Sequence, residues 1–206
     1  SPLFRLYSFG HSASPFMLCL VVFATLLFLT QQVFGDKVSA SVIVASIQGE
    51  VNFLNMVDEF NTRMDSSSVG KKVSPKTILS TGKNGKVALL FSNGTLITIK
   101  PGSRFYLRTY KQLEGIVAGV VDPGNLEEEP TQSELSGHLD YGDLIVKAPK
   151  LKKGSSMKLT SPLGVAGIRG TMFQLMAVRN SVTGDIMGGI NLISGDIDFT
   201  DTGGNV

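Results

Sequence analysis

Paired aspartates are the residues whose spacing could support hydrolysis in this chain of 206 residues. Asp196 and Asp198 stand two positions apart, which places both side chains on one side of a strand, and Asp140 and Asp143 form a second close pair. Neighbouring carboxylates can take different pKa values and so divide the roles of acid and base. Because aspartates on strands more often face solvent than catalyse, a carboxylate-dependent hydrolase is the weaker interpretation. We expect no catalytic residue and a protein that is not an enzyme.

Metal and cofactor chemistry has little support in the composition. The chain has one cysteine, Cys19, and two histidines, His11 and His138. These residues are too few for a Cys/His zinc site or a disulfide framework, so we expect neither a metal nor a cofactor. Nineteen basic residues against 17 acidic ones give a net charge of +2, which is too balanced to indicate a nucleic-acid partner.

A lysine-rich stretch offers two interpretations. Such a cluster could bind a phosphate or a lipid headgroup. The preferred interpretation is a solvated basic loop that faces the acidic run 127–129, which itself lies in an expected solvated loop or insertion at 122–137. The stretch spans residues 147–158 and holds Lys147, Lys150, Lys152, Lys153 and Lys158.

The most distinctive run is Gly164-Val165-Ala166-Gly167-Ile168-Arg169-Gly170-Thr171. A phosphate-binding loop would have Gly-x-Gly-x-x-Gly at the start of a helix, whereas these glycines recur every three residues and a strand is expected next. Gly164, Gly167 and Gly170 instead predict close backbone approach or positive φ in a packed turn. We expect Arg169 to be partly buried and to lock this turn through a carboxylate or carbonyl partner, with ligand binding as the alternative.

The elements that must position these residues begin with a leader. Residues 1–40 are predicted to be a signal peptide or a membrane anchor, and their apolar core is an expected helix. No Asp, Glu, Lys or Arg lies between Arg5 and Asp36, and residues 16–29 are almost wholly apolar. This core is shorter than the ~20 residues of a spanning helix, so the preferred interpretation is a signal peptide cleaved after Gly35 or Ala40. Membrane contact is expected only through residues 16–35, if they are retained.

Residues 41–206 are predicted to form one all-β domain. Strand-like runs recur with turn signals between them, which indicates either an elongated, solenoid-like roll or a twisted sandwich. Asn93-Gly94 is the preferred pair for a two-residue hairpin turn and would set Phe91 opposite Leu96 and Leu89 opposite Thr98. Residues 55–74 are expected to be a loop with some helix. The predicted core is Val87, Leu89, Leu90, Phe91, Leu96, Ile97, Ile99, Phe105, Phe173, Leu175, Ile190, Leu192 and Ile197.

An ordered set of short motifs resembles the FecR-type domain. Its hallmark is similar to Thr160-Ser161-Pro162 followed by the run that ends in Arg169-Gly170-Thr171-Met172-Phe173. The resemblance covers about residues 42–206. The other matching pieces, in chain order, are Gly49-Glu50-Val51, Leu79-Ser80-Thr81-Gly82, the hairpin with Asn93-Gly94-Thr95, Pro101-Gly102-Ser103 and the closing strands from 189 to 195.

The resemblance implies a function in envelope signalling. The best-known members of the family sit in the inner membrane, face the periplasm and relay a signal from an outer-membrane siderophore receptor to a sigma factor. About 15 residues precede the apolar stretch here, so the resemblance favours a free-standing, exported protein, periplasmic or extracellular, that binds an envelope protein or polymer. The alternative is a membrane-anchored periplasmic regulator that relays a signal to a sigma factor.

Overall fold

The computed structural model describes residues 36–113 and 123–202. The chain separates into two compact units, Ser1–Gly35 and Asp36–Val206. The predicted leader helix, with the whole apolar core at residues 16–29, therefore lies outside the described residues. Residues 36–40, which the leader prediction included, are described and belong to the second unit.

The second unit is all-β, as predicted. Besides strands, the described residues form only two short 3-10 helices, η1 (Ser66–Ser68) and η2 (Pro123–Asn125). The strands are β1 (Lys37–Ser39), β2 (Val42–Gln48), β3 (Val51–Asn55), β4 (Phe60–Met64), β5 (Thr77–Thr81), β6 (Lys86–Phe91), β7 (Leu96–Ile99), β8 (Arg104–Leu113), β9 (Ser133–Lys147), β10 (Ser156–Ser161), β11 (Gly164–Arg179) and β12 (Ile186–Asp201).

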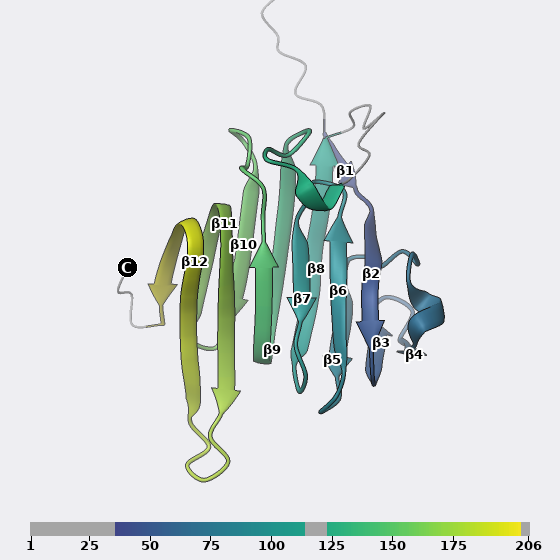
Figure 1. Cartoon of the computed structure of the whole chain (residues 1–206), viewed down its shortest axis with the longest axis vertical. Coiled ribbons are helices and arrows are strands. Elements are labelled where there is room, and N and C mark those ends of the chain that lie inside the picture. Colours follow the sequence, from purple (N-terminus) through teal and green to yellow (C-terminus); the bar gives the residue numbers. More distant parts are fainter. Residues whose placement is uncertain (1–35, 114–122, 203–206) are drawn as a thin grey trace, which may run out of the picture. The chain divides into compact units, whose positions relative to one another are not determined.

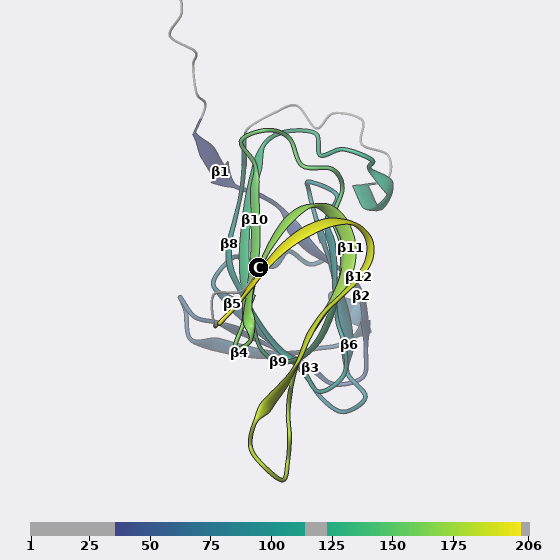
Figure 2. The same cartoon turned by 90° about the vertical axis from the view of Figure 1, so that its left-hand side faces the viewer.

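These strands form one sheet that folds back on itself into two faces (Figures 1 and 2). One face runs from β4 through β3, β5 and β8 to the first half of β9, then to β10. The other face joins β2, β6 and β7 to the second half of β9. Because β9 and β11 each pair in both faces, the domain is a roll, which decides between the two architectures left open above.

The long strands turn from one face to the other at glycines. Gly142 bends β9 with a φ of 105°, and a Cβ there would lie 2.4 Å from the Cα of Ser103. Gly170 bends β11 with a φ of 107°, and Gly195 bends β12 with a φ of 85°. An L side chain rarely adopts these φ values, so glycine at the corners lets one strand serve both faces.

Side chains that alternate inward from both faces fill the space between them. Eight of the predicted core residues are buried, namely Val87, Leu89, Phe91, Ile97, Ile99, Phe105, Phe173 and Leu175. Leu90 and Leu96 are only half-buried, because they alternate onto the outer side of β6 and β7. The prediction fails most clearly at Leu192, which is 46% exposed, and Ile190 and Ile197 are only partly buried. The reason is that β12 pairs with β11 alone.

The β6–β7 hairpin has a different register from the predicted one. Leu89 lies opposite Ile97 rather than Thr98, and Leu90 rather than Phe91 lies opposite Leu96. The loop has three residues, closed by a hydrogen bond from the Phe91 N–H to the Thr95 carbonyl at 2.9 Å. Gly94 has a φ of 91°, whereas Asn93 keeps a negative φ, as in a type I turn followed by a left-handed glycine.

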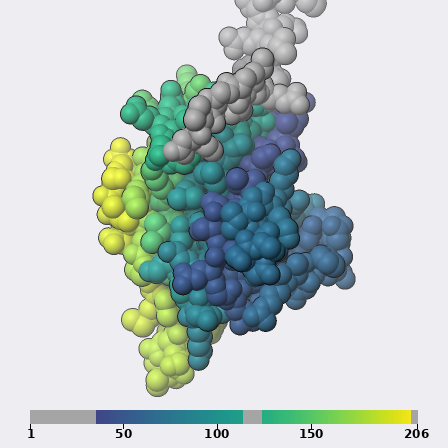
Figure 3. All heavy atoms as spheres, turned by 45° about the vertical axis from the view of Figure 1, so that its right-hand side comes forward, coloured from purple at the N-terminus to yellow at the C-terminus, as the bar shows by residue number. Residues whose placement is uncertain are grey.

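Residues 55–64 complete a second hairpin, contrary to the prediction, and only 65–74 form the expected loop with some helix, the 3-10 helix η1. β4 pairs along its whole length with β3, and the residues between them form a turn. In the sequence, Met56, Phe60 and Met64 follow one another at intervals of four residues, which is typical of a helix. These residues lie in the β3–β4 hairpin, so the spacing does not mark a helix here. The chain from 65 to 73 then lies against β2, where the Val44 N–H donates to the Lys71 carbonyl at 3.0 Å. Figure 3 shows this blue segment covering that end of the sheet.

The opposite end of the sheet is the free edge of β12. The β11–β12 hairpin extends beyond the neighbouring strands (Figure 1). Met187, Leu192 and Ile193 are exposed on it, and β12 has no strand on its outer side among the described residues.

Candidate functional site

The glycine motif forms the corner of β11, and two of its glycines are required there. A Cβ at Gly164 would lie 2.3 Å from the Thr200 carbonyl oxygen, so only glycine lets β12 approach this closely. At Gly170 a Cβ would lie 2.8 Å from the Cα of Lys150. Thr171 is buried directly after the corner, and its carbonyl accepts from the Ala148 N–H at 2.8 Å. Gly164 and Gly170 thus allow the close backbone approach at this corner, and Thr171 joins it to Ala148.

Arg169 does not lock the turn from within, contrary to the prediction. Its side chain is 80% exposed, and its Nε lies 3.6 Å from an oxygen of Asp198, which is 69% exposed. The cause is the strand alternation, which turns Ile168 into the core and therefore Arg169 outward. An exposed pair of this kind adds little to stability. The motif arginine is thus free to meet a ligand.

Gly167 is the glycine of the motif whose backbone conformation and surroundings would also accept another residue. Its φ lies outside the left-handed region, and a Cβ would meet nothing closer than 3.7 Å. In the register of the sheet it stands between Lys158 of β10 and Asp198 of β12. The missing side chain leaves an open floor between these two charged residues.

That floor belongs to a hollow of about 580 Å³ on the outer side of the sheet. Lys153, Lys158, Arg169 and Asp198 are among the residues that line it. Neither the Lys153 nor the Lys158 ammonium forms an ion pair with any described residue. Lys152 also lines the hollow, but its ammonium donates to the Pro130 carbonyl at 2.9 Å. The hollow therefore carries an excess of positive charge and suits an anion.

The acidic run lies beside this basic stretch, as the sequence predicted, but its carboxylates form no ion pair with these lysines among the described residues. The contacts between 127–129 and Lys150 are backbone hydrogen bonds, such as that from the Glu129 N–H to the Lys150 carbonyl at 3.0 Å. Glu129 is only 1% exposed rather than solvated. Its carboxylate accepts from the Ser133 hydroxyl at 2.5 Å, the Lys152 N–H at 2.7 Å and the Ser155 hydroxyl. Neutral donors thus satisfy the buried charge.

Of the aspartates considered for hydrolysis, Asp140 and Asp143 contact different partners rather than each other's. Asp140 accepts from the Arg104 Nε at 2.8 Å, and its other oxygen lies 3.5 Å from His138 Nε2. Burial and the charge of Arg108 lower the pKa of His138. Of Asp196 and Asp198, Asp198 lies 3.6 Å from the Nε of Arg169 and Asp196 is exposed.

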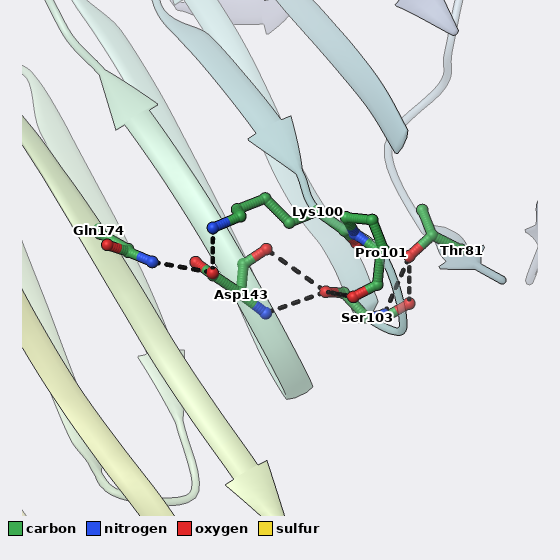
Figure 4. Close-up of polar contacts among 6 residues, drawn as sticks. All are labelled: Thr81, Lys100, Pro101, Ser103, Asp143 and Gln174. Carbon is green, nitrogen blue, oxygen red and sulfur yellow. Dashed lines mark hydrogen bonds and ion pairs between the residues drawn. The ribbon is translucent and has the colours of Figure 1, made fainter. Parts of the chain in front are cut away.

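Asp143 belongs to a polar cluster at the Gly142 corner (Figure 4). One carboxylate oxygen is held by the Lys100 ammonium at 2.7 Å and the Gln174 amide at 2.8 Å. The Asp143 N–H donates to the Ser103 hydroxyl at 2.9 Å, and the Ser103 N–H donates to the Thr81 hydroxyl at 2.9 Å. This cluster fastens the corner to β5, to β11 and to the turn between β7 and β8. Within the described residues no group of three His, Cys, Asp or Glu could hold a metal ion.

The hollow is the candidate binding site, and the sequence held only part of the signal for it. The alternation of Met157 and Leu159 inward with Lys158 outward can be read along the chain. That Lys158, Gly167 and Asp198 share a row cannot, because three strands must first be placed side by side.

Comparison with known proteins identifies the family. The model of the family described as FecR protein matches residues 77–198, which include the hairpin, the Gly142 corner and the motif around Arg169. No curated protein and no solved structure matches the chain. In the part of the chain that the structure describes, no helix has the length and apolar character to cross a membrane. The family match covers more than half of the sequence, and the chain therefore belongs to the FecR family.

Proposed function

We propose that this protein is an exported, non-enzymatic FecR-type domain that binds a protein or polymer of the bacterial envelope and acts in envelope signalling. The observation that carries the proposal is the outward position of Arg169, 80% exposed beside a hollow, within the region that matches the family. A charged residue of the motif that does not serve the core is available for recognition.

The apolar stretch at residues 16–29 supports export. It equally favours a second candidate, a membrane-anchored periplasmic regulator that relays a signal to a sigma factor. The two candidates share the β domain and differ in whether the leader is removed. N-terminal sequencing of the exported protein separates them: a start at Asp36 or Ser41 supports the free protein, and an intact leader supports the anchored one.

Binding is tested by retention on the envelope. The full chain, produced with its leader in a bacterial host, is released by osmotic shock and incubated with washed cell-wall and outer-membrane fractions. We expect retention on one of these fractions and its loss in Arg169→Glu. Lys83→Glu is the matched control, because Lys83 is exposed far along the sheet from the hollow and undergoes the same charge change. Wild-type protein that is retained on no fraction would contradict the proposal.

A further inference from the structure

We propose that the hollow floored by Gly167 binds the phosphate groups of an anionic envelope polymer. The proposal deepens the binding function above and rests on it, since it names the chemistry of the partner at the same site. The residues that carry it are Lys153, Lys158 and Arg169, with Asp198 on the far wall.

The geometry of the hollow comes from one absent side chain. Lys158, Gly167 and Asp198 occupy one row across three neighbouring strands. Adjacent strands are about 4.8 Å apart, so the two charged residues stand roughly 10 Å from each other with no side chain between them. A tetrahedral phosphate group fits such a gap, with Lys158 on one side and Arg169 beside Asp198 on the other.

The charges favour phosphate over other ligands. Four cations, Lys152, Lys153, Lys158 and Arg169, line the hollow together with one carboxylate, Asp198, so the lined surface has a net charge of about +3. Asp198 lies 3.6 Å from the Nε of Arg169, and the arginine side chain is 80% exposed, so a ligand can reach the guanidinium. A guanidinium fork matches two phosphate oxygens, and lysine ammonium groups add point charges around the third.

The site lies on the outer surface of a sheet rather than in an enclosed cavity, and this position suits a polymer. Ser156 precedes Lys158 on the outward side of β10 and lines the hollow, whereas the Thr160 hydroxyl beyond Lys158 is hydrogen-bonded to His138 and to the Gly137 carbonyl. A chain of linked phosphates could lie along this strand, with one group seated over Gly167. A small free anion would use only part of that surface.

Binding of short-chain polyphosphate to the full mature domain, followed by calorimetry at two salt concentrations, tests the site directly. Arg169→Ala and Lys158→Ala should each weaken binding about tenfold or more, as expected for a lost charge-assisted hydrogen bond. Gly167→Val should weaken it comparably with no change in charge, because valine fills the floor and suits a strand. Lys83→Ala, distant from the hollow, should bind as the wild type does.

Two results would overturn the proposal. Equal affinity of the wild type and Gly167→Val, with both folded by near-ultraviolet circular dichroism, would show that the hollow is not the site. Equal affinity for polyglutamate of matched charge would show that the surface does not select phosphate. If Gly167→Val fails to fold, Lys158→Ala decides the first point, because Lys158 is exposed and its removal leaves the sheet intact.

Cell walls stripped of phosphodiester-linked polymers by cold hydrofluoric acid separate this proposal from the binding function on which it rests. Retention on untreated walls and loss on stripped walls would support phosphate recognition. Equal retention on both would overturn phosphate recognition and leave envelope binding standing. Absence of the wild type from every envelope fraction would overturn both.

Discussion

The side-chain amide of Asn93 donates a hydrogen bond to the hydroxyl of Ser133 at 3.0 Å, across 40 positions of sequence. Both side chains are buried, and Ser133 donates in turn to the carboxylate of Glu129. The tip of the β6–β7 hairpin is thereby attached to the start of β9. The hairpin turn is thus part of a buried polar network in which each member orients the next.

Replacement of Asn93 should break this network and lower the stability of the domain. In Asn93→Ala the Thr95 N–H loses its acceptor and the Ser133 hydroxyl loses a donor, and both groups are buried. We expect the free energy of unfolding to fall by about 1–3 kcal/mol, measured by urea denaturation. Asn191→Ala, at an exposed site on β12, is the control and should change stability by less than about 0.5 kcal/mol.

The corner at Gly142 should not accept a side chain. Alanine there would combine a φ of 105° with a Cβ only 2.2 Å from the Ser103 hydroxyl oxygen. We expect Gly142→Ala to lower the melting temperature strongly or to prevent folding. Gly167→Ala is the matched control, because its Cβ has room, and it should melt close to the wild type. Equal melting temperatures for the two variants would contradict the assigned role of the corner.

Tyr110 should ionise at a higher pH than a tyrosine ordinarily does. Burial raises its pKa to about 12, and the charge of Glu129 acts in the same direction. Between pH 10 and 12 the unfolded chain loses this proton while the native protein keeps it, so the free energy of unfolding falls as pH rises. Absorbance at about 295 nm should show a late titration step that Tyr110→Phe removes. Ionisation of Tyr110 near pH 10 would contradict this prediction.

Arg169→Ala should leave stability almost unchanged. The guanidinium is 80% exposed and its contact with Asp198 is 3.6 Å long, so we expect a loss of less than about 1 kcal/mol. Thermal unfolding of the variant beside Lys83→Ala measures this. A loss several times larger would return Arg169 to the structural role that the sequence first indicated.

Cleavage of the leader after Gly35 should give a more stable domain than cleavage after Ala40. The later cut removes β1, which pairs with β8, and also Lys37, whose ammonium donates to the Gly154 carbonyl at 2.8 Å. We therefore expect a chain that starts at Asp36 to melt at a higher temperature than one that starts at Ser41, and the difference measures the contribution of β1. Edman degradation of the exported protein identifies which start occurs.

Local patterns were sufficient for some parts of the molecule. The strand alternation predicted an all-β domain, and the interior of the β6–β7 hairpin was identified because its apolar residues are close in sequence. The spacing of Met56, Phe60 and Met64 left a short helix and a loop open, and neither accounts for β4, which only its pairing with β3 defines. The buried state of Glu129 could not be predicted, because its donors come from separate segments.

The sequence by itself determined the fold class, the family and the motif around Arg169. It did so because strand alternation, turn glycines and the order of motifs are properties of the chain as written. Only the tertiary structure decided that Arg169 faces outward and that Gly167 forms the floor of a hollow. These facts depend on which strands lie side by side and on where each one bends, and residues far apart in sequence fix both.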